Sequence, residues 1–131
     1  MNEVQNIDQD GIGIQGYDPV SYFESTPQKG DPKIAAEYKG VRYHFVSREN
    51  RGKFAVDPRA YLPMYGGYCA TGMAGNMLVP IDPENYRIEN DRLFLFYDGE
   101  MGNTRPAWEA DPTDMFTKAE SNWQAADFDP A

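Results

Sequence analysis

Aspartate-proline pairs recur along this sequence and limit where its helices and turns can begin. Six of the ten prolines directly follow an aspartate. An N-cap aspartate accepts backbone N–H bonds, and a proline in the first helical position loses no hydrogen bond while fixing a helical φ. Three pairs precede helix-compatible runs, at residues 20–23, 59–62 and 113–123. We expect the other three, Asp31-Pro32, Asp82-Pro83 and Asp129-Pro130, to mark turns.

Two segments have the alternation that is typical of antiparallel β-hairpins. The first covers residues 37–46 and turns at Lys39-Gly40, and the second covers residues 86–96. In the first hairpin, period two places His44 beside Arg42, on the face opposite to the apolar side chains. We therefore expect His44 to lie at the surface or in a second layer.

Each predicted hairpin is followed by a helix that an Asp-Pro pair interrupts. Residues 42–45 align by eye with residues 92–95, and residues 54–58 align with residues 108–112. We interpret this pattern as a degenerate duplication, although the independent use of common capping residues would look similar. The predicted fold class is α+β, a compact single domain with two short antiparallel β-hairpins, each followed by a broken helix.

A chain of 131 residues is suited to one domain and can bury about two-thirds of its unfolded surface. We assign residues 1–10 to a flexible leader, residues 11–125 to the single domain and residues 126–131 to a loose C-terminal tail. Between the two predicted units lies an uncharged, glycine-rich segment, residues 62–77. Such a backbone can approach a ligand or another chain closely.

The charge balance narrows the classes of partner. The net charge is −9 and the twelve basic residues are scattered, whereas nucleic acids require clustered lysine and arginine. No apolar run approaches the roughly 18 residues that membrane insertion requires. We therefore expect neither nucleic-acid binding nor membrane insertion.

The N-terminal residues lack a basic region followed by an apolar one. This predicts a cytoplasmic protein, or a periplasmic or secreted one if the chain is a processed mature form. The single cysteine rules out an internal disulfide, so cysteine usage leaves the compartment open.

Distinctive blocks of sequence occur in order along nearly the whole chain from about Gly11. They are Gly16-Tyr17-Asp18-Pro19, residues 20–23, residues 37–42, Tyr43-His44-Phe45-Val46-Ser47, residues 49–51, 57–58 and 61, Tyr65-Gly66-Gly67-Tyr68-Cys69-Ala70, and residues 82–83, 108, 111–112 and 122–123. Together they resemble the small stand-alone YHS-domain proteins of bacteria. That resemblance implies a metal-binding module, of a kind also attached to copper-transporting ATPases, and commonly a secretory signal.

This chain departs from the metal-binding members of that family at two positions. Those members carry one cysteine just before the serine that corresponds to Ser47 and another three residues after it. Here the two positions hold Val46 and Asn50. The resemblance therefore implies a degenerate metal site that has lost its thiolate pair.

One cysteine and one histidine cannot fill a four-ligand zinc site. A Cu(I) site is less demanding, because Cu(I) favours thiolate and thioether ligands. Cys69, Met73 and Met77 fall at i, i+4 and i+8 and would share one face of a helix, and His44 could join them on folding. We therefore predict a non-enzymatic YHS-like module that binds or handles a soft metal, with copper as the candidate cofactor.

Three other interpretations of these residues stay open. The methionines could fill gaps in the core, and Cys69 could be a small buried thiol in a glycine turn. A metal-free module could use residues 66–77 and exposed tyrosines to bind a ligand, a protein partner or a second copy. A cysteine-dependent enzyme is the least supported, because no basic residue other than Arg59 lies within ten positions of Cys69.

Overall fold

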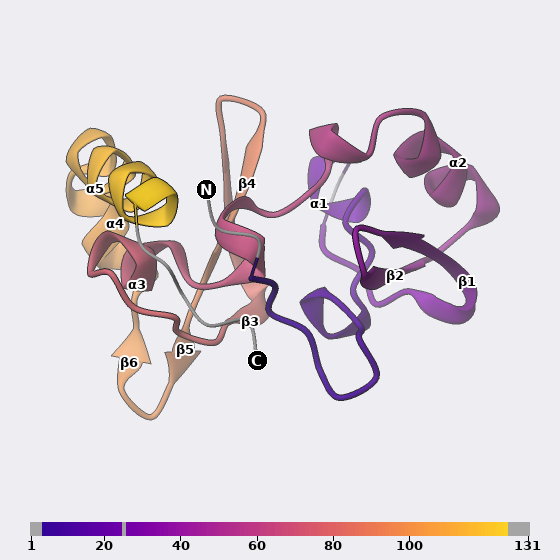
Figure 1. The fold of residues 1–131 in the computed structure, drawn as a ribbon, viewed down its shortest axis with the longest axis horizontal. Coiled ribbons are helices and arrows are strands. Elements are labelled where there is room, and N and C mark those ends of the chain that lie inside the picture. The colour runs from indigo at the N-terminus through magenta and orange to yellow at the C-terminus, as the bar shows by residue number, and fades with distance from the viewer. Residues whose placement is uncertain (1–3, 25, 126–131) are drawn as a thin grey trace.

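The computed structural model describes residues 4–24 and 26–125 (Figure 1). Its strands are β1 (Asp31–Tyr38), β2 (Val41–Phe45), β3 (Asp82–Glu89), β4 (Arg92–Phe96), β5 (Asp98–Gly99) and β6 (Gly102–Asn103). Its α-helices are α1 (Ser21–Glu24), α2 (Arg48–Val56), α3 (Ala70–Ala74), α4 (Arg105–Ala110) and α5 (Pro112–Ala125). Its short 3-10 helices are η1 (Ile14–Gly16), η2 (Pro58–Ala60) and η3 (Met64–Gly67).

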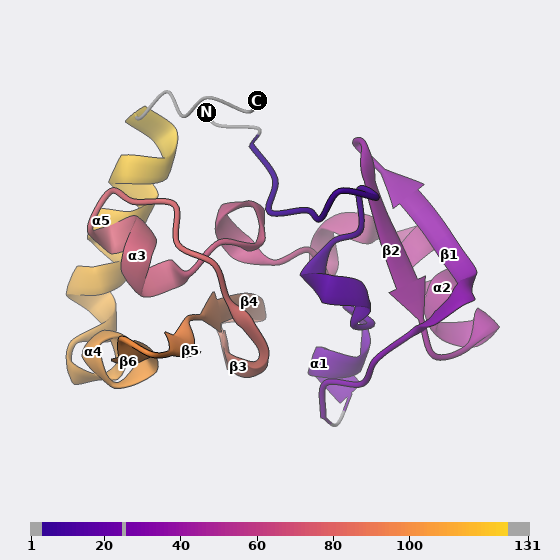
Figure 2. The same ribbon diagram turned by 90° about the horizontal axis from the view of Figure 1, so that it is seen from below.

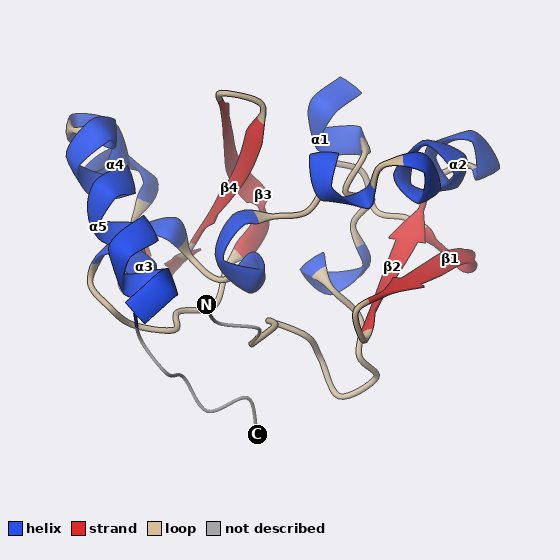
Figure 3. Ribbon diagram, turned by 45° about the horizontal axis from the view of Figure 1, so that its top comes forward, coloured by secondary structure: helices blue, strands red, loops and turns tan. Residues whose placement is uncertain are grey.

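The predicted α+β class is confirmed. The strands pair only as antiparallel hairpins, β1 with β2, β3 with β4 and β5 with β6. Figures 1 and 3 show two halves side by side: α1, α2, β1 and β2 form the first half, and β3–β6 with α3–α5 form the second. Among the described residues, no helix has both the length and the apolar character needed to cross a bilayer.

The two long hairpins have the same register. In β1–β2, Asp31 pairs with Phe45, and an irregularity precedes the regular pairs that end at the turn. In β3–β4, Asp82 pairs with Phe96, with the irregularity at the same place. Residue n of the first hairpin therefore corresponds to residue n + 51 of the second. The alignment by eye was wrong by one position, because it matched Arg42 to Arg92 rather than to Leu93.

The repeat also extends upstream of each hairpin. Ile14, Gln15 and Gly16 in η1 have φ values of 52°, 52° and 85°. Tyr65, Gly66 and Gly67, each 51 positions later, have φ values of 58°, 64° and 84°. The glycine-rich segment is therefore the start of the second repeat rather than a connection between two units. In the sequence, Gly16-Tyr17 recurs 51 positions later as Gly67-Tyr68, the same offset as between the hairpins, and this is the signal for the longer repeat.

Two of the Asp-Pro pairs that we expected in turns begin strands instead. Asp31 opens β1 and Asp82 opens β3, at equivalent positions. The side chain of each accepts a hydrogen bond at 2.9 Å from the backbone N–H two residues later, on Lys33 and Glu84. The aspartate therefore stabilises a local turn in the irregular first part of each strand.

The apolar core crosses from one half to the other. One buried cluster contains Val20, Phe45 and Phe54 of the first half together with Leu93 and Leu95 of the second. A second cluster lies within the second half. It is built around Phe94, Phe96 and Trp108.

His44 is buried, with 6% of its surface exposed, so the expectation of a surface or second-layer histidine was wrong. The segment before α1 covers this face of β2. Gly13 donates to the carbonyl of Arg42 at 2.9 Å, and a Cβ added to Gly16 would lie 3.2 Å from His44 Nδ1. This contact between segments far apart in the sequence overrides the period-two pattern of the strand.

Of the flexible leader that we assigned to residues 1–10, residues 1–3 lie outside the described residues, and residues 4–8 are held by contacts with η3 and with residues 12–13. Val4 is buried, and Asn6 donates to the carbonyl oxygens of Gly66 and Gly67, at 2.8 Å from its backbone N–H and at 3.1 Å from Nδ2. Figure 2 shows this segment running from the centre of the molecule into the first half. The tail assigned to residues 126–131 lies outside the described residues.

Tyrosine hydroxyls link the first half to β3. The buried hydroxyl of Tyr22 donates to the carbonyl of Pro83, and its ring meets that of Tyr86 edge to face at 5.2 Å. The more exposed hydroxyl of Tyr17 donates to Glu84 at 3.1 Å.

The hydrogen bonds of Tyr22 and Tyr17 allow a paired test of which contact between the halves contributes more to stability. We expect Tyr22→Phe to lower the free energy of unfolding by about 1–2 kcal/mol, because it leaves the buried Pro83 carbonyl without its partner. Tyr17→Phe should change it by less than about 0.5 kcal/mol. Urea denaturation measures both, and equal effects would contradict a main role for the buried bond.

Candidate functional site

Cys69 is fully buried at the N-terminus of α3. Its sulfur accepts hydrogen bonds from the backbone N–H groups of Gly72 and Tyr97, both at 3.4 Å. The sulfur also lies 3.3 Å from Thr104 Oγ1. The thiol therefore connects α3, the end of β4 and the start of α4.

Asp18 occupies the equivalent position in the first repeat and makes equivalent contacts. It is fully buried, and its carboxylate accepts from the N–H groups of Val20 at 2.8 Å and Val46 at 2.9 Å and from Asn50 Nδ2 at 2.9 Å. Val46 and Tyr97 are 51 positions apart, as are Asp18 and Cys69. The backbone N–H of Asp18 donates to Gln28, and that of Cys69 donates to Val79, which keeps the same spacing.

Cys69 therefore takes the place of a buried carboxylate that organises the first repeat. Asn50 contacts the buried side chain in the first repeat, and Thr104 does so in the second. Thr104 follows Asn50 by 54 positions, the same spacing that separates Asp57-Pro58 from Asp111-Pro112. Every polar contact of the Cys69 sulfur comes from the second repeat. These contacts agree with the interpretation of Cys69 as a structural thiol.

The other three predicted ligands lie in different surroundings. Met73 is fully buried in the second cluster, whereas Cys69 belongs to the first. Met77 is 57% exposed, because α3 ends at Ala74 and no helix carries the i+8 position. His44 lies on β2 in the first repeat. Within residues 4–24 and 26–125, no group of three or more His, Cys, Asp or Glu side chains could hold a metal ion.

His44 lacks the surroundings of a general base for a thiol. Burial, followed by the nearby charge of Arg42, lowers the pKa of its imidazole from the ordinary value. The ring is therefore neutral at neutral pH. The hydrogen bonds of the Cys69 sulfur go to Gly72, Tyr97 and Thr104 and none goes to His44, so the described residues do not form the Cys–His pair that an enzyme would need.

A groove of about 760 Å³ lies where the two repeats meet. We call it the inter-repeat groove. Its first wall comes from β1, β2 and the segment around η2, and its second comes from η3 and the last turns of α5. The lining residues are Gln5, Tyr38, Lys39, Tyr43, Arg59, Leu62, Pro63, Met64, Tyr65, Gly66, Glu120, Trp123 and Gln124.

The second repeat carries a hollow in the equivalent place. It has a volume of about 440 Å³ and lies between the tip of β3–β4 and the start of α5. Its lining includes Glu89, Asn90, Phe94, Thr113 and Phe116, which correspond to Tyr38, Lys39, Tyr43, Arg59 and Leu62. A hollow between hairpin and helix is thus part of the repeated unit. In the first repeat η3 and α5 enlarge it.

Tyr65, a residue of the groove wall, has a buried hydroxyl without a hydrogen-bond partner among the described residues. Tyr65 is 2% exposed, and its hydroxyl makes no hydrogen bond with any described residue. Its ring packs against those of Trp123 and Phe94, with centroids 6.2 and 6.1 Å away. Burial raises the pKa of the Tyr65 hydroxyl, and the nearby charge of Glu120 raises it further. Tyr65 therefore remains a proton donor across the physiological range.

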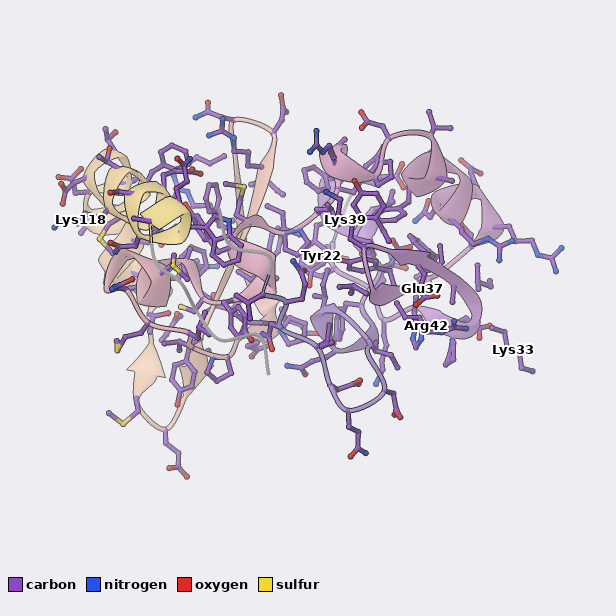
Figure 4. All side chains as sticks on the ribbon, in the orientation of Figure 1. Tyr22, Lys33, Glu37, Lys39, Arg42 and Lys118 are labelled. Atoms are coloured by element: carbon purple, nitrogen blue, oxygen red, sulfur yellow. The ribbon has the colours of Figure 1, made fainter. Side chains whose placement is uncertain are left out.

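Two cations and one carboxylate complete the polar lining. Lys39 and Arg59 are exposed, and neither forms an ion pair within the described part of the chain. Figure 4 places Lys39 beside the boundary between the two halves. Glu120 belongs to the opposite wall, on α5.

No local pattern in the sequence predicts this groove. Its lining residues lie up to 119 positions apart, from Gln5 to Gln124, and only the folded chain brings them together. The partial signal was the abundance of tyrosine, because a tyrosine near an apolar margin needs a partner for its hydroxyl.

Searches against protein-family models, curated proteins and solved structures found no match to this chain. The resemblance to YHS-domain proteins therefore stays a prediction from the sequence.

The contributions of Asp18 and Cys69 to stability can be compared directly by mutation. We expect Asp18→Ala to lower the free energy of unfolding by about 3 kcal/mol or more, because three donors lose a charged acceptor. Cys69→Ala should cost about 1–2 kcal/mol, since its sulfur contacts are weaker and a small side chain is removed. Urea denaturation measures both, with the exposed Asp10→Ala as the control. A larger loss for Cys69→Ala would contradict the ranking.

Proposed function

We propose that this protein is a non-enzymatic, metal-free binding module that takes a small organic ligand into the inter-repeat groove. The observation that carries the proposal is the buried hydroxyl of Tyr65, a residue that lines the groove, because this donor has no hydrogen-bond partner among the described residues. Leaving such a group unpaired costs about 1–3 kcal/mol. A ligand that accepts this hydrogen bond would remove that cost.

The size and chemistry of the groove support the same proposal. Small-molecule sites commonly have volumes of roughly 300–1,000 Å³ and combine apolar walls with a few polar groups. The inter-repeat groove, at about 760 Å³, falls in that range. Its aromatic and aliphatic side chains surround a small number of charged and hydroxyl groups. It also lies at the junction of two structural units, a frequent place for ligand sites.

Comparison with Ile14 indicates that the fold does not require a hydroxyl at the position of Tyr65. Ile14 occupies the matching position in the first repeat, is buried, and has a similar left-handed backbone. An apolar side chain is therefore compatible with this part of the repeat. This supports a role for the Tyr65 hydroxyl outside the packing of the protein.

The copper role predicted for Cys69 has less support. Three polar contacts already surround the sulfur, Met77 is largely exposed, and His44 belongs to β2 in the first repeat. A Cu(I) ion needs at least two soft ligands directed at one point. The contacts of this site therefore favour the metal-free alternative over the soft-metal one.

A fragment screen tests the proposed groove. The uniformly ¹⁵N-labelled full chain would be titrated with a diverse fragment library and followed by amide chemical shifts. We expect the bound fragments to shift Lys39, Arg59, Met64 and Gln124. The matching hollow at Asn90 and Thr113 serves as the internal control. Shifts confined to that hollow, or no fragment bound, would contradict the proposal.

A copper titration tests the competing role of Cys69. We expect Cys69→Ser to bind Cu(I) no more weakly than the wild-type protein, because the sulfur is buried and already has three polar contacts. The measurement is anaerobic competition with a chelator of known Cu(I) affinity. A loss of affinity of about tenfold or more in Cys69→Ser, with an unchanged fold, would restore the soft-metal hypothesis.

A further inference from the structure

We infer that the ligand of the inter-repeat groove is a planar aromatic carboxylate. This inference rests on the proposed function and adds the chemical class of the ligand. The carboxylate would lie at Lys39 and Arg59, and the aromatic body would lie between the apolar walls. A polar substituent at the far end of the ligand would accept a hydrogen bond from Tyr65.

The charges of the groove favour an anion. Lys39 and Arg59 line the same wall of a protein whose net charge is −9, and both lack an acidic partner within the described residues. The guanidinium of Arg59 can bind a carboxylate through two parallel hydrogen bonds. The ammonium group of Lys39 would add a second positive charge beside it.

The second repeat shows that these cations are not required by the repeated unit. Asn90 takes the place of Lys39, and Thr113 takes that of Arg59. Glu89 of that hollow also replaces the uncharged Tyr38, and the cation of that hollow, Arg92, stands where the first repeat has Val41. The fold therefore forms a hollow without cations at the positions of Lys39 and Arg59. The presence of cations at these two positions of the groove points to the ligand rather than to stability.

The aromatic lining favours a flat ligand. Tyr38, Trp123 and the aliphatic side chains of Leu62, Pro63 and Met64 supply apolar surface from both walls. Aromatic rings bury much area and pair with one another in offset or edge-to-face geometries. A planar ring system can meet these walls while its charged end stays at the exposed cations.

The second wall of the groove provides a donor and an acceptor. Tyr65 can donate, since its hydroxyl stays protonated, and Glu120 on α5 is close enough for its charge to affect that hydroxyl. A phenol substituent on the ligand would accept from Tyr65 and donate to Glu120. A ligand with a carboxylate and a hydroxyl therefore matches the polar groups of the two walls.

A matched set of probes tests this class of ligand. The set is 6-hydroxy-2-naphthoate, its uncharged carboxamide, and 2-naphthoate, which lacks the hydroxyl. Isothermal titration of the full chain at low salt would measure each affinity. We expect the hydroxynaphthoate to bind about tenfold or more tightly than the carboxamide, because a hydrogen bond to a charged group is the stronger one.

Variants of the groove decide which groups are responsible. Lys39→Gln with Arg59→Gln should remove the preference for the carboxylate, whereas the exposed pair Lys33→Gln with Arg48→Gln, which changes the net charge equally, should keep it. Tyr65→Phe should weaken the hydroxynaphthoate about fivefold or more and leave 2-naphthoate unchanged. The same substitution should not lower the protein's own resistance to urea, since it removes an unpaired buried hydroxyl.

The outcomes separate this inference from the proposed function. Equal affinity for naphthoate and carboxamide, or a preference that survives in the Lys39 and Arg59 double variant, would overturn the assignment of an anion. Failure of all three probes, with fragments still bound in the groove, would overturn the ligand class and leave the binding module standing. Binding at the second hollow alone would overturn both.

Discussion

Each repeat depends on one buried acceptor that gathers donors from separate segments. Asp18 accepts from Val20, Val46 and Asn50, and so fixes α1, the end of β2 and α2 relative to one another. A buried carboxylate is tolerated only when it is well hydrogen-bonded, and these contacts satisfy that condition. Cys69 makes the corresponding contacts in the second repeat, at the longer distances typical of sulfur.

Both repeats contain a hollow at equivalent positions. The two hollows differ because the segment after the Asp-Pro pair is short in the first repeat and long in the second. After Asp57-Pro58 the first repeat forms only η2, Pro58–Ala60, whereas after Asp111-Pro112 the second forms α5, Pro112–Ala125. A helix of 14 residues is about 21 Å long, enough for its last turns to reach the first repeat. Glu120 and Trp123 thereby become a wall of the inter-repeat groove.

Local patterns predicted the hairpins, the Asp-Pro helix starts and the existence of a repeat. They failed where distant segments meet. The matching arginines, Arg42 and Arg92, misplaced the alignment because the register is set by pairing across the strands rather than by residue identity. The burial of His44 depends on the segment before α1, and the exposure of Met77 depends on where α3 ends. The groove needs both repeats, and therefore has no local signature.

The comparison of the two repeats also separates residues that both repeats need for the fold from residues that only one repeat carries. Where the repeats share a contact, as at Asp18 and Cys69, the fold explains the residue, and the thiol needs no metal or redox role to account for it. The repeats also differ at the groove. There Tyr65 replaces a buried isoleucine, and Lys39 and Arg59 stand where the second repeat has Asn90 and Thr113. Because the fold forms without these groups, we propose that they serve a ligand of the groove.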